Sequence, residues 1–271
     1  MKPEADILFF CGQSNMQGSA EKLTDDNAVI ENAFEYRFLT DSLEPLKNPV
    51  GENISPDGKE GSLDGGHWDK MRNNCLFAAY MGRTNLVPKF CNAYTRERKV
   101  TTIAVHCAKG DTRIEFWLPH TGCFDTTVAK GKRAIEKTLE NYRIGKRYLI
   151  WLQGESNQVY GTSAQAYKSL LKEIKEGFKI ELAIDEFAII KVGNFTEDER
   201  GEVIIRAQKE ICLEDRDFYM LTEVVEELFQ EERYKNAEAK GHLSSDGLEK
   251  LGEIAGKNLA LHANEEVEMD G

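Results

Sequence analysis

Five short apolar runs divide the chain, and each is rich in Ile, Val, Phe or Tyr. Most of them show no alternation with polar residues, which is typical of strands that are covered on both faces of a parallel sheet. The pattern therefore predicts five buried parallel strands. They cover residues 6–11, 100–107, 147–152, 186–192 and 217–224.

Segments between these runs have the spacing of amphipathic helices. Tyr167, Ile174 and Phe178 share one face of a predicted helix. Residues 248–261 repeat this spacing nearer the end of the chain. Strands that alternate with helices through right-handed crossovers form a layered α/β domain. We therefore predict a single domain over residues 1–271, with a five-stranded parallel sheet between two layers of helices.

Two parts of the chain do not follow these patterns. Residues 20–70 include a Gly-rich, charged stretch without periodicity. A structureless loop of that length is uncommon inside a compact domain, so we interpret 20–70 as a long loop region that either covers the active site or is mobile. The acidic end of the chain, residues 264–271, is predicted to be frayed.

The composition excludes several classes of partner. The chain has 271 residues, of which 41% are hydrophobic, and its formal net charge is -12. This charge makes nucleic acid and anionic membrane surfaces poor partners. No apolar stretch is long enough for a transmembrane helix. The first residues are acidic and their apolar run is too short for a signal peptide, so we expect a cytoplasmic protein. The sequence carries no signal for an oligomeric state.

The cysteines do not predict a metal site. No two of them are arranged as Cys-x-x-Cys, the spacing that is common in zinc sites. We expect buried free thiols instead. The six cysteines are residues 11, 75, 91, 107, 123 and 212.

Chemically active residues follow several of the predicted strands. The first strand is followed by the sequence Gly-Gln-Ser-Asn at 12–15, and the second by Gly110. The third leads into Gln153 and Glu155, and the last is followed, after a charged stretch, by His242. Ligands of open α/β sheets bind at the carboxyl ends of the strands, so we expect these residues to lie close together.

This set of residues contains what acyl transfer requires. A serine nucleophile needs a base, and histidine is a base near neutral pH. The base needs a group that fixes its tautomer, and the oxyanion needs preorganised N–H donors. A serine at a strand end is also common as a turn or capping residue, so the position of Ser14 alone leaves both interpretations open.

Four blocks of the sequence resemble those of SGNH-type hydrolases. The most similar groups are carbohydrate esterase family six and the sialate O-acetylesterase-like proteins. The resemblance runs from residue 5 to about 256 and implies a flavodoxin-like α/β/α sandwich that removes acetyl groups from sugars without a metal or cofactor. The blocks are GQSNMQG at 12–18, GDTRIEFW at 110–117, WLQGESN at 151–157 and HLSSDGLEKLG at 242–252.

The resemblance also implies roles for single residues. Ser14 matches the nucleophile, and the coincidence of four blocks favours this role over that of a turn residue. His242 matches the base. The backbone N–H groups of Ser14 and Gly110 match oxyanion donors, and Gln153 stands where the family supplies a side-chain donor. Asn15 is expected to hold the site together by hydrogen bonds.

The acidic member of a catalytic triad is the uncertain part of this comparison. SGNH enzymes usually carry Asp three residues before the histidine, where this chain has Ala239. We favour Glu155 as the residue that supports His242. Glu238 and Asp246 are alternatives, although Asp246 is also placed to cap the last helix. A serine–histidine pair with a main-chain carbonyl behind the imidazole is a further alternative.

The predicted function is that of a serine esterase that releases acetate from O-acetylated carbohydrates. Acetylated xylo-oligosaccharides and sialic-acid-like sugars are the expected small-molecule or oligosaccharide substrates, and Trp68 and Trp117 are candidates for stacking on a sugar ring. One alternative is another SGNH esterase, lipase or thioesterase. The other is a carbohydrate-binding protein without activity, because the Asp before His242 is missing.

Overall fold

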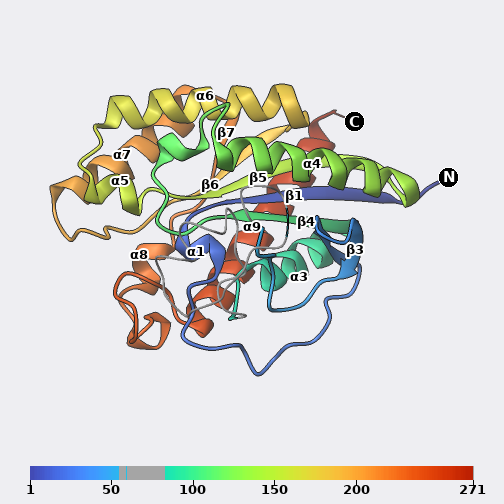
Figure 1. Ribbon diagram of the computed structural model, residues 1–271, viewed down its shortest axis with the longest axis horizontal. Coiled ribbons are helices and arrows are strands. Elements are labelled where there is room, and N and C mark those ends of the chain that lie inside the picture. Colours follow the sequence, from blue (N-terminus) through green and yellow to red (C-terminus); the bar gives the residue numbers. More distant parts are fainter. Residues whose placement is uncertain (55–58, 60–82, 271) are drawn as a thin grey trace.

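A computed structural model describes residues 1–54, 59 and 83–270. It contains a central sheet with the strand order β3-β2-β4-β1-β5-β6-β7 (Figure 1). All five predicted strands are present in it. They are β1 (Glu4–Gly12), β4 (Thr101–Ala108), β5 (Arg143–Leu152), β6 (Glu186–Ile190) and β7 (Phe218–Thr222). Their order, β4-β1-β5-β6-β7, is the 2-1-3-4-5 order of flavodoxin-like folds, which confirms the predicted fold class.

The prediction of five strands is wrong, because the sheet formed by the described residues has seven. Strand β2 (Ala33–Arg37) pairs in parallel with β4, and β3 (Ser42–Pro45) pairs with β2 in antiparallel orientation. Both lie in the region 20–70 that was interpreted as a loop. Strand β2 lacks a continuous apolar pattern because it contains polar residues. The buried carboxylate of Glu35 accepts a hydrogen bond from the Gly51 N–H and forms an ion pair with Arg37.

Helices cover both faces of the sheet. Helices α3 and α9 pack together on one face, and α4, α6 and α7 cover the other (Figure 1). The acidic end of the chain, which was predicted to be frayed, is helical as far as Asp270, where α9 ends. The bounds are α3 (Val87–Arg98), α4 (Gly122–Asn141), α6 (Ala164–Leu182), α7 (Glu199–Glu214) and α9 (Ser245–Asp270).

Short helices follow the carboxyl ends of the strands. They are α1 (Ser14–Gln17), the 3₁₀ helix η2 (Ile114–Trp117), α5 (Glu155–Val159), α8 (Val225–Leu228) and η3 (Glu232–Tyr234). Gly12, the last residue of β1, has φ +146°, and a Cβ there would lie 2.1 Å from the carbonyl oxygen of Leu152. Only glycine fits this conformation and this close approach, which brings the ends of β1 and β5 together just before Ser14.

Two further features bear on the predictions from composition. No helix of the described residues is both long and apolar enough to cross a membrane. The five described cysteines are free thiols, and all but Cys212 are buried. Cys75 lies outside the described residues.

Candidate active site

Ser14 and His242 meet at the carboxyl edge of the sheet, although 228 positions separate them in the chain. His242 Nε2 lies 2.8 Å from Ser14 Oγ, and His242 Nδ1 lies 3.1 Å from the carbonyl oxygen of Lys240. A carbonyl oxygen only accepts hydrogen bonds, so this contact places the ring proton on Nδ1. Nε2 is then free to accept the proton of the Ser14 hydroxyl.

The surroundings of His242 favour its neutral form. Burial lowers the pKa of His242 below its ordinary value, and the nearby backbone groups of Lys240 and Ala239 only partly oppose this effect. A neutral imidazole is the form that accepts a proton from serine. The site therefore holds a usable base at neutral pH.

Glu155 lies behind Asn15 and not behind His242. Its Oε1 accepts a hydrogen bond from Asn15 Nδ2 at 3.2 Å, while Oε2 is buried with no hydrogen-bond partner among the described residues. Burial raises the pKa of Glu155 to about 7, against the opposing hydrogen bonds from its own N–H, Asn15 and Gly154. We predicted that Glu155 directly supports His242. The geometry does not show such a contact.

Asn15 connects Glu155 to the loop that carries His242. Its Nδ2 also donates to the carbonyl of Gly241 at 3.4 Å, and its Oδ1 accepts from the N–H of Leu243 at 3.1 Å. The residues on both sides of His242 are thus held by one side chain. This agrees with the expectation that Asn15 organises the site by hydrogen bonds.

Glu238 and Asp246, the other two carboxylates considered from the sequence, do not support His242 either. The Glu238 side chain is 66% exposed and lies 3.9 Å from Arg83. Asp246 is exposed on the first turn of α9, and it does not cap that helix. The cap is Ser244, whose Oγ accepts the Gly247 N–H at 3.1 Å. Of the alternatives that the sequence left open, the structure shows the serine–histidine pair with a main-chain carbonyl.

Gln17 occupies the space where an oxyanion is expected. The Gly110 N–H donates to Gln17 Oε1 at 2.5 Å. Gly110 is adjacent to the serine, since a Cβ built on it would lie 3.7 Å from Ser14 Cβ. Gln17 was not among the predicted site residues, but its position three residues after Ser14 on α1 is a signal, because residues one helical turn apart share a face.

The amide of Gln153, predicted as an oxyanion donor, is engaged by buried acceptors in the structure. Its Nε2 is surrounded by the Oδ1 of Asn157 at 2.7 Å, the carbonyl of Thr112 at 3.0 Å and the Oε1 of Gln13 at 3.3 Å. An amide nitrogen has two N–H groups, so these three acceptors use both. The buried side chain joins the ends of β1 and β5 to the segment around η2.

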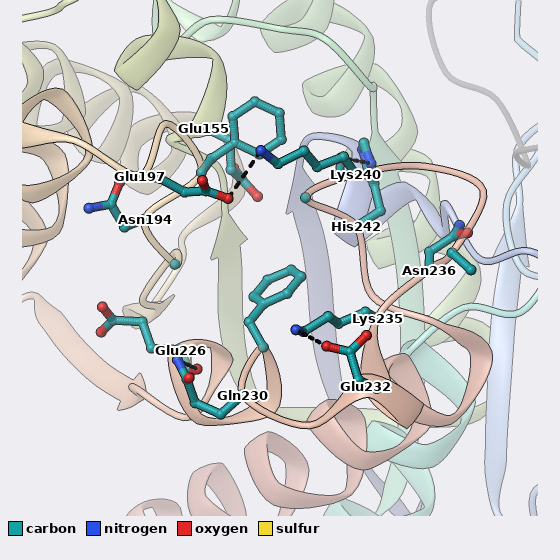
Figure 2. A pocket seen from close by; sticks show the side chains of 15 residues that line it. Glu155, Asn194, Glu197, Glu226, Gln230, Glu232, Lys235, Asn236, Lys240 and His242 are labelled. Atoms are coloured by element: carbon teal, nitrogen blue, oxygen red, sulfur yellow. Dashed lines mark hydrogen bonds and ion pairs between the residues drawn. The ribbon is translucent and has the colours of Figure 1, made fainter.

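A pocket of about 580 Å³ opens beside His242 (Figure 2). The Phe195 ring stands edge-on to the His242 ring, with 6.4 Å between the centroids. A Cβ on Gly241, which has φ +76°, would lie 2.1 Å from Phe195, so glycine lets the aromatic ring reach the backbone next to His242. The lining residues are Glu155, Gly193, Asn194, Phe195, Glu197, Glu226, Phe229, Gln230, Glu232, Lys235, Asn236, Ala237, Lys240, Gly241 and His242.

The tryptophans predicted to stack on a sugar do not line this pocket. Trp117 is fully buried, stands edge-on to Trp151 with 5.4 Å between centroids, and donates to Thr112 Oγ1. The prediction for Trp117 is therefore wrong, since the side chain belongs to the core. Trp68 lies outside the described residues.

The chain is similar to known proteins in its sequence and in its fold. The family model described as "Carbohydrate esterase, sialic acid-specific acetylesterase" matches residues 4–260. A search of curated proteins returned no match. Among solved structures, NanS has a TM-score of 0.64 at 13% identity, over 98% of this chain and 99% of that chain. A protein from Arabidopsis thaliana has a TM-score of 0.63 at 16% identity, over 94% of this chain and 98% of that chain. At these identities the two structures show a shared fold.

Proposed function

The chain belongs to the carbohydrate esterase family of sialic acid-specific acetylesterases, and we propose that it removes O-acetyl groups from carbohydrates through an acetyl-enzyme on Ser14. Membership of this family makes it a carboxylic-ester hydrolase. The 2.8 Å contact between His242 Nε2 and Ser14 Oγ is the observation that supports Ser14 as the nucleophile.

The first half of the reaction forms the acetyl-enzyme. His242 Nε2 takes the hydroxyl proton as Ser14 Oγ attacks the acetyl carbonyl carbon. The charge on the carbonyl oxygen is stabilised by the N–H groups of Ser14 and Gly110, once the side chain of Gln17 has moved away. The Lys240 carbonyl accepts from Nδ1 throughout and holds the imidazolium. The tetrahedral intermediate then expels the sugar oxygen, which receives the proton from Nε2.

The second half repeats these roles with water. His242 removes a proton from a water molecule that attacks the acetyl group on Ser14. The second tetrahedral intermediate breaks the bond to Ser14 Oγ, which regains a proton from the imidazolium. Acetate leaves and the free enzyme is restored, so no external reactant besides water is consumed.

Two rival interpretations fit the site less well. A binding protein without activity does not need a histidine that is oriented by a carbonyl and bonded to a serine. A lipase or long-chain thioesterase needs a wide apolar cleft, whereas four glutamates and two lysines line the pocket beside His242. The geometry therefore favours a short acyl group on a polar alcohol.

The test is acetate release from acetylated xylo-oligosaccharides and from p-nitrophenyl acetate. We expect Ser14→Ala and His242→Ala to lose activity by at least about a thousandfold. Ser163→Ala is the matched control, because it removes a serine that caps α6 through the Ala166 N–H. Mass spectrometry during turnover should find an acetyl group on Ser14. Full activity of Ser14→Ala would exclude the proposed mechanism.

A further inference from the structure

The pocket beside His242 has a defined place in the proposed reaction. His242 delivers its proton to the oxygen of the departing sugar, so that oxygen must lie next to the imidazole. The pocket is lined by His242 and Gly241 and also by the aromatic rings of Phe195 and Phe229. It is therefore the space that the sugar part of the substrate enters.

Carboxylates outnumber cations around this pocket. Its lining contains Glu155, Glu197, Glu226 and Glu232 but only the two lysines Lys235 and Lys240. Before partners outside the lining are counted, carboxylates are thus in excess over ammonium groups, in a chain whose formal net charge is -12.

Both lysines are paired with carboxylates of the same lining. Lys235 Nζ lies 2.5 Å from Glu232, and Lys240 Nζ lies 3.1 Å from Glu197. Figure 2 shows Lys240 reaching across to Glu197 from the segment that carries His242. Among the lining residues that the structure describes, every lysine has a carboxylate partner.

The two remaining carboxylates differ in their partners outside the lining. Glu226 forms an ion pair with Lys191, while Glu223, which lies 3.0 Å from Lys191, has a second cation in Lys209 at 2.7 Å. Among the described side chains, Glu155 accepts a hydrogen bond only from the neutral amide of Asn15. A second anion brought into this pocket would meet like charges and no unpaired cation of the described lining.

We propose that the pocket selects an acetylated sugar without charge and disfavours one that carries a carboxylate, such as a sialic acid. This inference rests on the proposed function. The hydroxyl groups of a neutral sugar are donors that carboxylate oxygens accept, and its C–H face packs on aromatic rings such as Phe195 and Phe229. The description of the family names sialic acid, and our inference departs from that substrate.

The alternative to this proposal is that Lys240 binds the carboxylate of an acidic sugar. Its side chain is 81% exposed, and exposed ion pairs are weak, so it is able to exchange Glu197 for a substrate carboxylate. In that case Lys240 would make the site specific for acidic sugars. The two explanations differ in what happens to each substrate when Lys240 is replaced.

The experiment compares kcat/KM for an O-acetylated sialic acid and for the methyl ester of its carboxyl group, with an acetylated xylo-oligosaccharide and p-nitrophenyl acetate alongside. The two sialic acid compounds differ by one methyl group, which removes the negative charge of the carboxylate. We expect the methyl ester to exceed the free acid by about tenfold or more at low salt, with a smaller ratio at high salt. We also expect the neutral xylo-oligosaccharide to exceed the free acid.

Single-residue variants test whether the preference for the uncharged ester arises from the pocket. Glu226→Gln should reduce the preference for the methyl ester, and Glu227→Gln, an exposed neighbour on α8 outside the lining, should leave it unchanged. Lys240→Gln should not reduce activity on the free acid more than on its ester. A selective loss on the free acid would show that Lys240 binds the carboxylate and would overturn the proposal.

The remaining outcomes separate this inference from the function on which it rests. Equal or faster hydrolysis of the free acid, with p-nitrophenyl acetate still cleaved, overturns the charge selection and leaves the esterase intact. Cleavage of p-nitrophenyl acetate alone overturns the assignment of the pocket to a sugar. If no ester is cleaved, the proposed function fails and this inference fails with it.

Discussion

The Gly110 N–H, expected to bind the substrate oxyanion, donates to Gln17 Oε1 at 2.5 Å. The amide oxygen of Gln17 thus occupies the place that a substrate oxygen would take in the proposed reaction. A substrate must displace this contact before the Gly110 N–H can stabilise the charge that develops on it. In the free enzyme, the Gly110 N–H is therefore already bonded to a side chain of the enzyme itself.

Replacing Gln17 by alanine should therefore increase kcat/KM for p-nitrophenyl acetate. The substrate no longer competes with an internal hydrogen bond, whose net worth is about 0.5–1.5 kcal/mol, so the expected gain is about two- to tenfold. Gln17→Glu is the matched variant, because it retains the acceptor and adds a negative charge beside the oxyanion, which should lower activity. If both variants lose activity equally, Gln17 instead holds Gly110 in position.

Glu155→Gln should have a small effect on catalysis. The imidazole is held by the Lys240 carbonyl, and a glutamine at 155 can still accept from Asn15 Nδ2. We expect a loss in kcat of less than about tenfold, against at least about a thousandfold for a missing triad member. Asn15→Ala should cost more than Glu155→Gln, because Asn15 bonds the residues on both sides of His242. A loss as deep as that of His242→Ala would restore Glu155 as the third catalytic residue.

The position of the reacting pair was predictable from the sequence. Apolar runs located β1 and the later strands, and the carboxyl ends of parallel strands share an edge, so Ser14 and His242 were expected together. The orientation of His242 was not predictable in the same way. The partner of the imidazole is the backbone carbonyl of Lys240. Because the contact does not involve the lysine side chain, the residue type at this position gives no indication of it.

The walls of the pocket were missed for a different reason. Phe195 follows strand β6 in the sequence Gly-Asn-Phe, and the residues after this strand were not considered among the strand ends. The same rule that located Ser14 applies to them. Strand β2 was missed because its buried Glu35 breaks the apolar pattern, and the pairing of that carboxylate with Arg37 is visible only in three dimensions.

The pH dependence of kcat/KM should follow the ionisation of His242. The base must be neutral, so activity falls as the pH drops through the pKa of His242 in the free enzyme. Burial lowers that pKa, so we expect the midpoint on the acidic side to lie below 6.5, the ordinary value for histidine. The measurement is a pH profile of kcat/KM with p-nitrophenyl acetate. A midpoint above 6.5 would indicate that an anionic group supports the imidazolium.

Lys130→Met should destabilise the fold without direct damage to the active site. The side chains of Lys130 and Glu52 are 0% and 4% exposed and lie 2.8 Å apart. Removal of the cation leaves the Glu52 carboxylate buried without its partner, at an expected cost of about 3–5 kcal/mol in the free energy of unfolding. Urea unfolding at pH 7 measures this loss. The double variant with Glu52→Gln should recover part of it, because the unpaired charge is then gone.

Glu155→Gln should stabilise the protein increasingly as the pH rises. The pKa of Glu155 is raised from 4.5 to about 7 in the folded state, so between these values the folded state holds a proton that the unfolded state has lost. Stability contributed by this group is therefore full below about pH 4.5 and decreases through pH 7, by about 3 kcal/mol. Glutamine does not titrate and avoids this loss.

The measurement is the difference in unfolding free energy between Glu155→Gln and the natural chain at pH 5 and at pH 8. We expect it to shift in favour of the variant at pH 8. A constant difference would mean that Glu155 ionises at an ordinary pKa. The buried Oε2 would then need a hydrogen-bond donor, and Glu155 would contribute its full negative charge to the pocket at neutral pH.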